Sequence, residues 1–219
     1  MGHGIFSAFL TWGLQMNYEH WRHYARGWLL HVFGREHQAF NAYAAAYRAK
    51  PDDAKAARHL AHIAAGRKQY DVADKWFVET VRLAPKDADA HFNRGFVLEQ
   101  AGRSREAIAA FAEAVRLQPT LDRAWYGMGL AHARLGEQDE AAAAFAKCVE
   151  LQPMNGEGFY QWGMACHRAN RHEKVAKIAK RLADFEPKWA MALIDDTGRS
   201  DLFEMVSKEV REMLAKRRR

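Results

Sequence analysis

The residues of this sequence best suited to chemistry are its histidines, of which there are eleven. Two pairs, His20 with His23 and His59 with His62, are spaced three residues apart, so each pair would share one face of a helix. A metal site needs three or four converging ligands. Neither pair has a cysteine or a carboxylate cluster beside it. We therefore expect structural histidines and no metal site.

Catalytic arrangements of other kinds do not stand out. The sequence has no nucleophile paired with a base, no glycine-rich phosphate loop and no carboxylate pair in a recognisable context. Its two cysteines, Cys148 and Cys166, are expected to pack as small buried apolar side chains. The sequence therefore predicts neither an enzyme nor a cofactor.

Composition indicates a soluble, folded protein. Of 219 residues, 49% are apolar and 27% are charged, and the net charge is +6. This basic excess permits an acidic partner without requiring one, and we expect no nucleic-acid binding. The cysteine count is typical of a reducing compartment. We expect a cytoplasmic protein, with a membrane-peripheral location as the alternative.

The N-terminus carries an apolar run, Ile5–Met16, but neither a secretory signal nor a membrane span is expected there. No Lys or Arg precedes the run, and no small-residue cleavage site follows it. The run covers 12 residues, whereas a spanning helix needs about 20.

The elements that must position any site repeat along the chain. The five letters VRLAP at 81–85 return as VRLQP at 115–119 and as VELQP at 149–153. Such a period is the first thing to test in a sequence, because it identifies repeat architectures. Every proline of the chain lies 34 residues from the next: Pro51, Pro85, Pro119, Pro153 and Pro187.

Other positions repeat with the prolines. When each proline is counted as residue 32 of a repeat, the repeats begin at His20, Ala54, Ala88, Asp122 and Gly156, and the eighth residue is always small. The eighth residues are Gly27, Ala61, Gly95, Gly129 and Gly163. The residues at position 24 are Tyr43, Phe77, Phe111, Phe145 and, departing from the pattern, Ala179. This sequence resembles the tetratricopeptide repeat family over residues 20–189. The resemblance implies an all-α fold, a right-handed α-solenoid of stacked helix-turn-helix repeats.

The register also predicts the organisation of the ends. Residues 1–19 would form an apolar N-terminal helix, a degenerate half-repeat in which Asn17 stands at the proline position and ends the helix. Residues 190–219 would form C-terminal capping helices, including Leu202–Lys216, and a basic tail. Five repeats lie between them: 20–53, 54–87, 88–121, 122–155 and 156–189.

The resemblance implies a concave face lined by the first helix of each repeat, with positions 5 and 9 pointing inward. These positions are rich in aromatic residues here, which suits a bound peptide segment. The alternative is that position 5 is aromatic for packing alone. The predicted groove residues are Tyr24, Trp28, Arg58, His62, Phe92, Asn93, Phe96, Arg123, Tyr126 and Tyr160.

A sharper hypothesis comes from the carboxylate clamp that co-chaperones of this family use to hold the C-terminal carboxylates of heat-shock chaperones. Three of the five clamp positions match: Arg58, Asn93 and Arg123. Two do not, because His62 replaces an asparagine and Gly127 replaces a cation. The hypothesis predicts a partner with an acidic or free C-terminal tail.

The N-terminal helix raises a second possibility for function. It has more apolar surface than the first repeat alone would cover. Three explanations compete: the helix packs deeply against the first repeat, it binds a partner or a second copy of the chain, or it lies in a membrane interface. The predicted interface residues are Ile5, Phe6, Phe9, Leu10 and Trp12. We expect a non-catalytic protein-interaction scaffold that binds a peptide or protein segment in its groove. The alternative is a membrane-peripheral or complex-embedded subunit that docks through the N-terminal helix.

Overall fold

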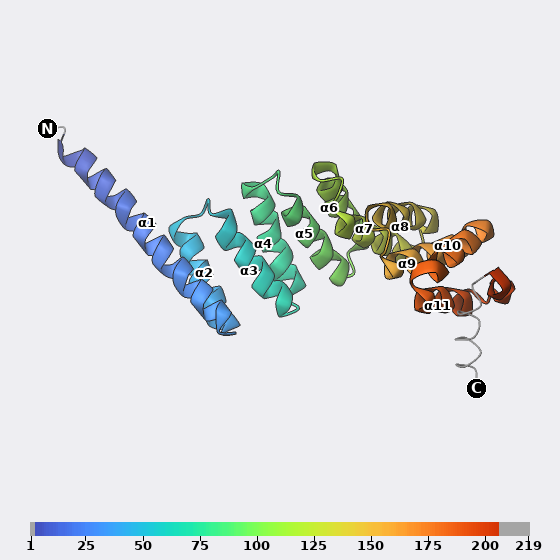
Figure 1. Cartoon of the computed structure of the whole chain (residues 1–219). Helices are drawn as coiled ribbons and strands as arrows, with labels where there is room; N and C mark the ends of the chain where they lie inside the picture. Colours follow the sequence, from blue (N-terminus) through green and yellow to red (C-terminus); the bar gives the residue numbers. More distant parts are fainter. Residues whose placement is uncertain (1–2, 206–219) are drawn as a thin grey trace. The chain divides into compact units, whose positions relative to one another are not determined.

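The structure is a computed structural model that describes the backbone of residues 3–205 and the side chains of residues 18–203. Within that part the chain is all-α, and no strand is present (Figure 1). The helices are α1 (His3–Val32), α2 (Glu36–Ala49), α3 (Ala54–Gly66), α4 (Tyr70–Leu83), α5 (Ala88–Gln100), α6 (Ser104–Leu117), α7 (Asp122–Leu135), α8 (Gln138–Leu151), α9 (Gly156–Arg168), α10 (His172–Phe185), α11 (Pro187–Thr197) and the short 3-10 helix η1 (Ser200–Met205).

The chain divides into two compact halves, Met1–Gly102 and Arg103–Arg219, called here the N-terminal and C-terminal halves. In the N-terminal half each helix from α1 to α5 packs on the next. In the C-terminal half each helix from α6 to α11 does the same, and α11 also packs on α9. Sequential antiparallel packing of this kind lets neighbouring hairpins bury the apolar faces that one hairpin alone would expose.

Helix starts follow directly from the sequence around the repeated prolines. Four prolines lie in the turn that ends one repeat, whereas Pro187 is the first residue of α11. Acceptor side chains then cap the next helix: Asp53 accepts a hydrogen bond from the Lys55 backbone N–H at 2.9 Å, and Asn155 accepts one from Gly158 at 2.9 Å. Such caps satisfy backbone donors that have no partner inside the helix.

A second repeated feature lies in the turn within each hairpin. The fifteenth residue of every repeat has a positive φ, which only glycine adopts without strain and asparagine tolerates. Repeats one, three and four use glycine there, and the fifth uses Asn170. The second repeat places Lys68 at φ 58°. The equivalent positions are Gly34, Lys68, Gly102, Gly136 and Asn170.

The core is built where the aromatic ring at position 24 meets the small residue at position 8. A Cβ on Gly129 would lie 2.7 Å from the Phe145 ring, and one on Gly27 would lie 3.0 Å from the Tyr43 ring. The fifth repeat has Ala179 at position 24, and Leu193 from α11 fills the space instead. A Cβ on Gly163 would lie 2.6 Å from Leu193. Glycine is therefore required for close helix approach at these sites.

The N-terminal helix differs from the prediction. The expected end of a separate helix at Asn17 was wrong, because α1 is one continuous helix of 30 residues (Figure 1). Asparagine keeps a backbone N–H and does not clash with the preceding turn, so it cannot break a helix as proline does. At the other end, α11 ends at Gly198, whose φ is 63°. The predicted terminal helix Leu202–Lys216 and the basic tail lie outside the described residues, apart from the part covered by η1.

Candidate interaction faces

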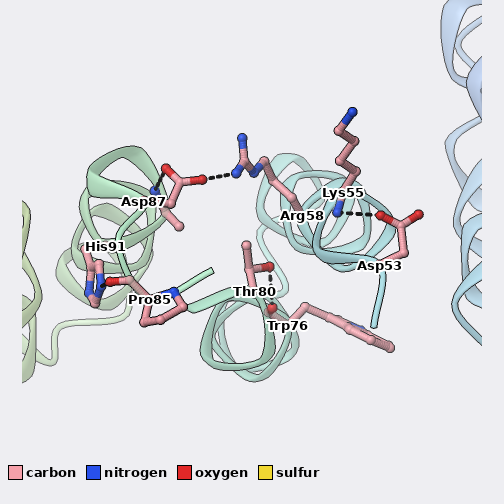
Figure 2. A network of polar contacts seen from close by, with 9 residues as sticks. Asp53, Lys55, Arg58, Trp76, Thr80, Pro85, Asp87 and His91 are labelled. Carbon is pink, nitrogen blue, oxygen red and sulfur yellow. Dashed lines mark hydrogen bonds and ion pairs between the residues drawn. The ribbon is translucent and has the colours of Figure 1, made fainter. Parts of the chain in front are cut away.

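In the N-terminal half, two position-5 residues reach the neighbouring first helix or the residue that caps it. The Tyr24 hydroxyl lies 3.0 Å from Nε2 of His59, which joins α1 to α3. The Arg58 guanidinium forms an ion pair with Asp87, at the start of α5 (Figure 2). Both side chains therefore bridge successive first helices.

The C-terminal half repeats this arrangement with tyrosine. The Tyr126 hydroxyl donates a hydrogen bond to Oε1 of Glu157 at 2.7 Å, and the Tyr160 hydroxyl donates one to Oδ2 of Asp196 at 2.7 Å. Burial is the main cause that raises the pKa of both phenols. Four position-5 residues are thus engaged in links between helices, which is the packing role that the sequence left open.

Two of the predicted clamp residues of the N-terminal half, Arg58 and His62, contact other side chains of this half. The Asp87 carboxylate, which pairs with Arg58, would compete with the carboxylate of a bound peptide. The His62 ring lies edge-on to Phe77, with centroids 5.3 Å apart. Desolvation, followed by the nearby positive charge of Arg58, lowers the pKa of His62, which favours a neutral ring. Asn93 is half-buried on α5.

In the C-terminal half, the missing cation at Gly127 has a steric cause. A Cβ at this position would lie 2.6 Å from the ring of Phe111, so no larger residue fits without displacing it. Arg123 is exposed on the same helix, α7. The glycine therefore belongs to the core packing rather than to a clamp.

Position 9, unlike position 5, leaves apolar surface exposed in the N-terminal half. Trp28 on α1 is 55% exposed and Phe96 on α5 is 50% exposed, and His62 is exposed on α3 between them. We call these three residues the first-helix face. The corresponding Leu130 and Met164 of the C-terminal half are half-buried.

The histidines that invited a metal interpretation have structural partners. His20 is buried, with Nδ1 3.2 Å from the Ala46 carbonyl oxygen and Nε2 3.3 Å from Oδ2 of Asp53. The His59 ring stacks on Tyr43 at 4.5 Å between centroids, and burial lowers its pKa. Across residues 18–203, no three His, Cys, Asp or Glu side chains gather in a geometry that would hold a metal ion.

Both cysteines are buried and free. Burial raises the pKa of Cys148 to about 11 and also raises that of Cys166. A thiol with a raised pKa has little thiolate at neutral pH, so neither is a good nucleophile.

Comparison with known proteins identifies the repeat. The Tetratricopeptide repeat family matches residues 60–122 and 97–156. Residues 60–156 of the chain are therefore tetratricopeptide repeats. Among curated protein sequences, none matches it.

Solved structures of other tetratricopeptide repeat proteins share the fold. A crystal structure of MamA is 19% identical with a TM-score of 0.71, and the match covers 83% of this chain and 95% of that one. MamA from Desulfovibrio magneticus RS-1 gives 19% identity and a TM-score of 0.71, over 78% and 96% of the two chains. YrrB, described as a TPR protein with an unusual peptide-binding site, is 22% identical with a TM-score of 0.68. That match covers 78% of this chain and 89% of YrrB.

The N-terminal half has one further exposed surface that the sequence interpretation missed. Large apolar side chains line one side of α1 and continue to Phe33, the residue that follows it. Arg22 and Arg26 lie exposed near them. The spacing of three, four and eleven residues could have revealed this side. We call it the α1 outer stripe: Tyr18, Trp21, Leu29, Val32 and Phe33, which are 50–70% exposed.

The predicted N-terminal interface lies further along the same helix. The backbone of Ile5, Phe6, Phe9, Leu10 and Trp12 belongs to α1, and their side chains lie outside the described residues. Figure 1 shows α1 continuing beyond the end of α2. Within residues 3–205, no helix combines the length and apolarity that crossing a membrane requires.

Proposed function

We propose that this protein is a non-catalytic scaffold that binds a peptide or protein segment on the first-helix face. The observation that carries the proposal is the exposure of Trp28 and Phe96 on helices flanking α3, where His62 is also exposed. Exposed aromatic side chains held on rigid helices lose little entropy on binding and commonly dominate interface energies. Members of the tetratricopeptide repeat family typically bind protein partners without catalysis.

Apolar anchors are the partner chemistry that we propose for this face. An acidic or free C-terminal tail would have to displace Asp87 from Arg58, so carboxylate capture is a secondary contribution. Phe92 and Asn93 flank the face on α5 and would contribute contacts. In the C-terminal half, taken by itself, the corresponding predicted contacts are Arg123, Tyr126 and Tyr160.

The experiment is selection from a random peptide library displayed on phage, followed by fluorescence anisotropy with the selected peptides. We expect Trp28→Ala and Phe96→Ala each to weaken binding about tenfold, as aromatic anchors do. The matched control is Val78→Ala, which removes an exposed apolar side chain, 45% exposed, from the second helix α4. It should change affinity less than about twofold. Selected peptides that bind all three variants alike would refute the proposal.

A second candidate function is peripheral attachment to an anionic membrane through the α1 outer stripe. Tyr, Trp and Phe side chains are favoured at the headgroup level of a membrane, and basic residues beside them attract anionic lipid. Trp21 and Phe33 are 62% and 70% exposed, and Arg22 and Arg26 lie exposed near the stripe. This combination favours a lipid surface over water as the neighbour of the stripe.

Co-sedimentation with vesicles tests the second candidate. The full chain should bind vesicles containing phosphatidylglycerol and should bind phosphatidylcholine vesicles weakly. The double variant Trp21→Ser, Phe33→Ser should lose this binding, whereas Val72→Ser, Val78→Ser on α4 should keep it. If the full chain ignores both vesicles and instead forms oligomers that the first variant dissolves, the stripe is a contact between copies and the membrane proposal fails.

A further inference from the structure

The C-terminal half contains an open pocket of about 370 Å³ between α9 and α10. It uses none of the residues of the first-helix face and none of the predicted groove residues. Its volume is near the lower end of the range of ligand pockets, which suits one large side chain with its neighbours. The lining residues are Phe159, Trp162, Lys174, Lys177, Ile178 and Arg181.

The floor of the pocket is apolar and well supported. Phe159 and Ile178 are 7% and 3% exposed, and Trp162 is half-buried beside them. The Phe159 ring packs against Phe185, with centroids 5.5 Å apart, and lies 6.0 Å from the Trp162 ring. Aromatic packing on both sides fixes this floor, so a ligand would find it preformed.

The rim of the pocket carries three cations. Lys174, Lys177 and Arg181 are spaced by three and four residues along α10, so they share one face of the helix. All three are exposed. The Arg181 guanidinium lies 5.6 Å from the centre of the Phe185 ring, which holds it at the rim.

Several other cations of the C-terminal half are paired with a carboxylate. Arg103, Arg116 and Lys147 each form an ion pair with a glutamate three residues away, at 2.6–2.7 Å. No ion pair joins a rim cation to a carboxylate within residues 18–203, although Glu173 and Asp184 lie on the same helix. The pocket therefore combines a buried apolar floor with unneutralised positive charge.

We propose that this pocket binds an acidic peptide segment in which a bulky apolar side chain lies between carboxylates. The apolar side chain would fill the space above Phe159 and Ile178, which removes apolar surface from water. The flanking carboxylates would pair with Lys174, Lys177 and Arg181. Charge alone would attract any acidic peptide, so the apolar floor supplies the selectivity for a bulky side chain. This site is separate from the proposed first-helix face, so either can fail alone.

The test uses a fluorescein-labelled peptide with one phenylalanine between two pairs of glutamates, and measures anisotropy with the full chain. We expect Lys177→Ala and Arg181→Ala each to weaken binding about fivefold, as loss of one charged contact does. The matched control is Lys180→Ala, which removes the same charge from the same helix outside the pocket lining. It should change affinity less than about twofold.

Two altered peptides separate the parts of the proposal. A peptide with serine in place of phenylalanine should lose about tenfold in affinity if the floor is used, and a peptide with glutamines in place of glutamates should lose binding at the rim. If Lys180→Ala weakened binding as much as Lys177→Ala and Arg181→Ala do, the attraction would be nonspecific and the proposal would be overturned. The same holds if the serine peptide bound as tightly as the phenylalanine peptide. Loss of binding in Trp28→Ala would also overturn it, because the peptide would then occupy the first-helix face. If anionic vesicles displaced the labelled peptide, and the phenylalanine and serine peptides bound equally well, the pocket would be assigned to lipid instead.

Discussion

Asp87 joins two repeats through its two carboxylate oxygens. Oδ1 accepts a hydrogen bond from the backbone N–H of Ala90 at 3.1 Å and caps α5, while Oδ2 pairs with the guanidinium of Arg58 on α3 (Figure 2). The side chain of Arg58 is 36% exposed and that of Asp87 is 22% exposed, so the pair is only partly screened by water. Nε of Arg58 is buried with no hydrogen-bond partner in the described structure.

Replacement of Asp87 should therefore show two separable losses. Asp87→Ala removes both the cap and the ion pair, and we expect it to lower the free energy of unfolding by about 1–2 kcal/mol. Asp87→Asn keeps a capping oxygen and removes the charge, so its cost should be clearly smaller. The measurement is the urea midpoint, with hydrogen exchange in α5 to locate the loss. Equal costs for the two variants would show that the cap contributes nothing.

The close contact of Phe145 with Gly129 predicts opposite results for the same substitution at two sites. Gly129→Ala would force the ring away from a Cβ at 2.7 Å, and we expect a cost of about 1–3 kcal/mol. Gly66→Ala is the control, because no atom lies within 4 Å of a Cβ there and alanine favours the helix. It should leave stability unchanged or raise it. Thermal unfolding of both variants distinguishes a packing requirement from a general intolerance of alanine.

Lys68 is the residue in the positive-φ turns for which the backbone conformation is least suitable. Lys68→Gly should raise the free energy of unfolding by up to about 1 kcal/mol, because glycine adopts φ 58° without the Cβ clash. Gly136→Lys makes the reverse change at φ 80° in the fourth repeat and should lower stability by a similar amount. A stabilising effect of the second variant would contradict this explanation of the turns.

The pKa values of His59 and His62 predict that the N-terminal half loses stability in acid. Desolvation by the surrounding side chains lowers the pKa of both from the ordinary value of 6.5, although part of the His62 ring stays exposed. The charges of His31 and Arg58 lower both pKa values further. Asp53 acts on His59 in the opposite direction. Because the unfolded chain takes up these protons first, stability is complete above about pH 6.5 and falls as pH drops below it toward the folded pKa values.

Urea unfolding at about pH 7.5 and about pH 5.5 measures this effect. The double variant His59→Gln, His62→Gln should lose less stability between the two conditions than the natural sequence does. His37→Gln, at an exposed histidine on α2, is the control and should leave the difference unchanged. A natural chain equally stable at both pH values would contradict the prediction.

The 34-residue spacing of the prolines and the small residues at position 8 predict the helical fold, because spacing and residue size act locally or between neighbouring helices. What the proline register could not reveal was the continuity of α1. Asn17 occupies a proline position without proline's effect on the backbone, so the register predicts a break that the chemistry does not impose. Nor did position 24 of the fifth repeat indicate that Leu193 would take the place of an aromatic ring.

The predicted site residues depended on the fold in the same way. The sequence alone determined that aromatic residues recur at positions 5 and 9. Only the tertiary structure decided that Tyr24, Arg58, Tyr126 and Tyr160 are linked to a later helix or to the residue that caps it. Trp28 and Phe96 remain exposed. The physical reason is that a repeat pattern fixes which side chains share a helix face, whereas partners from other helices determine which of them are left free to bind.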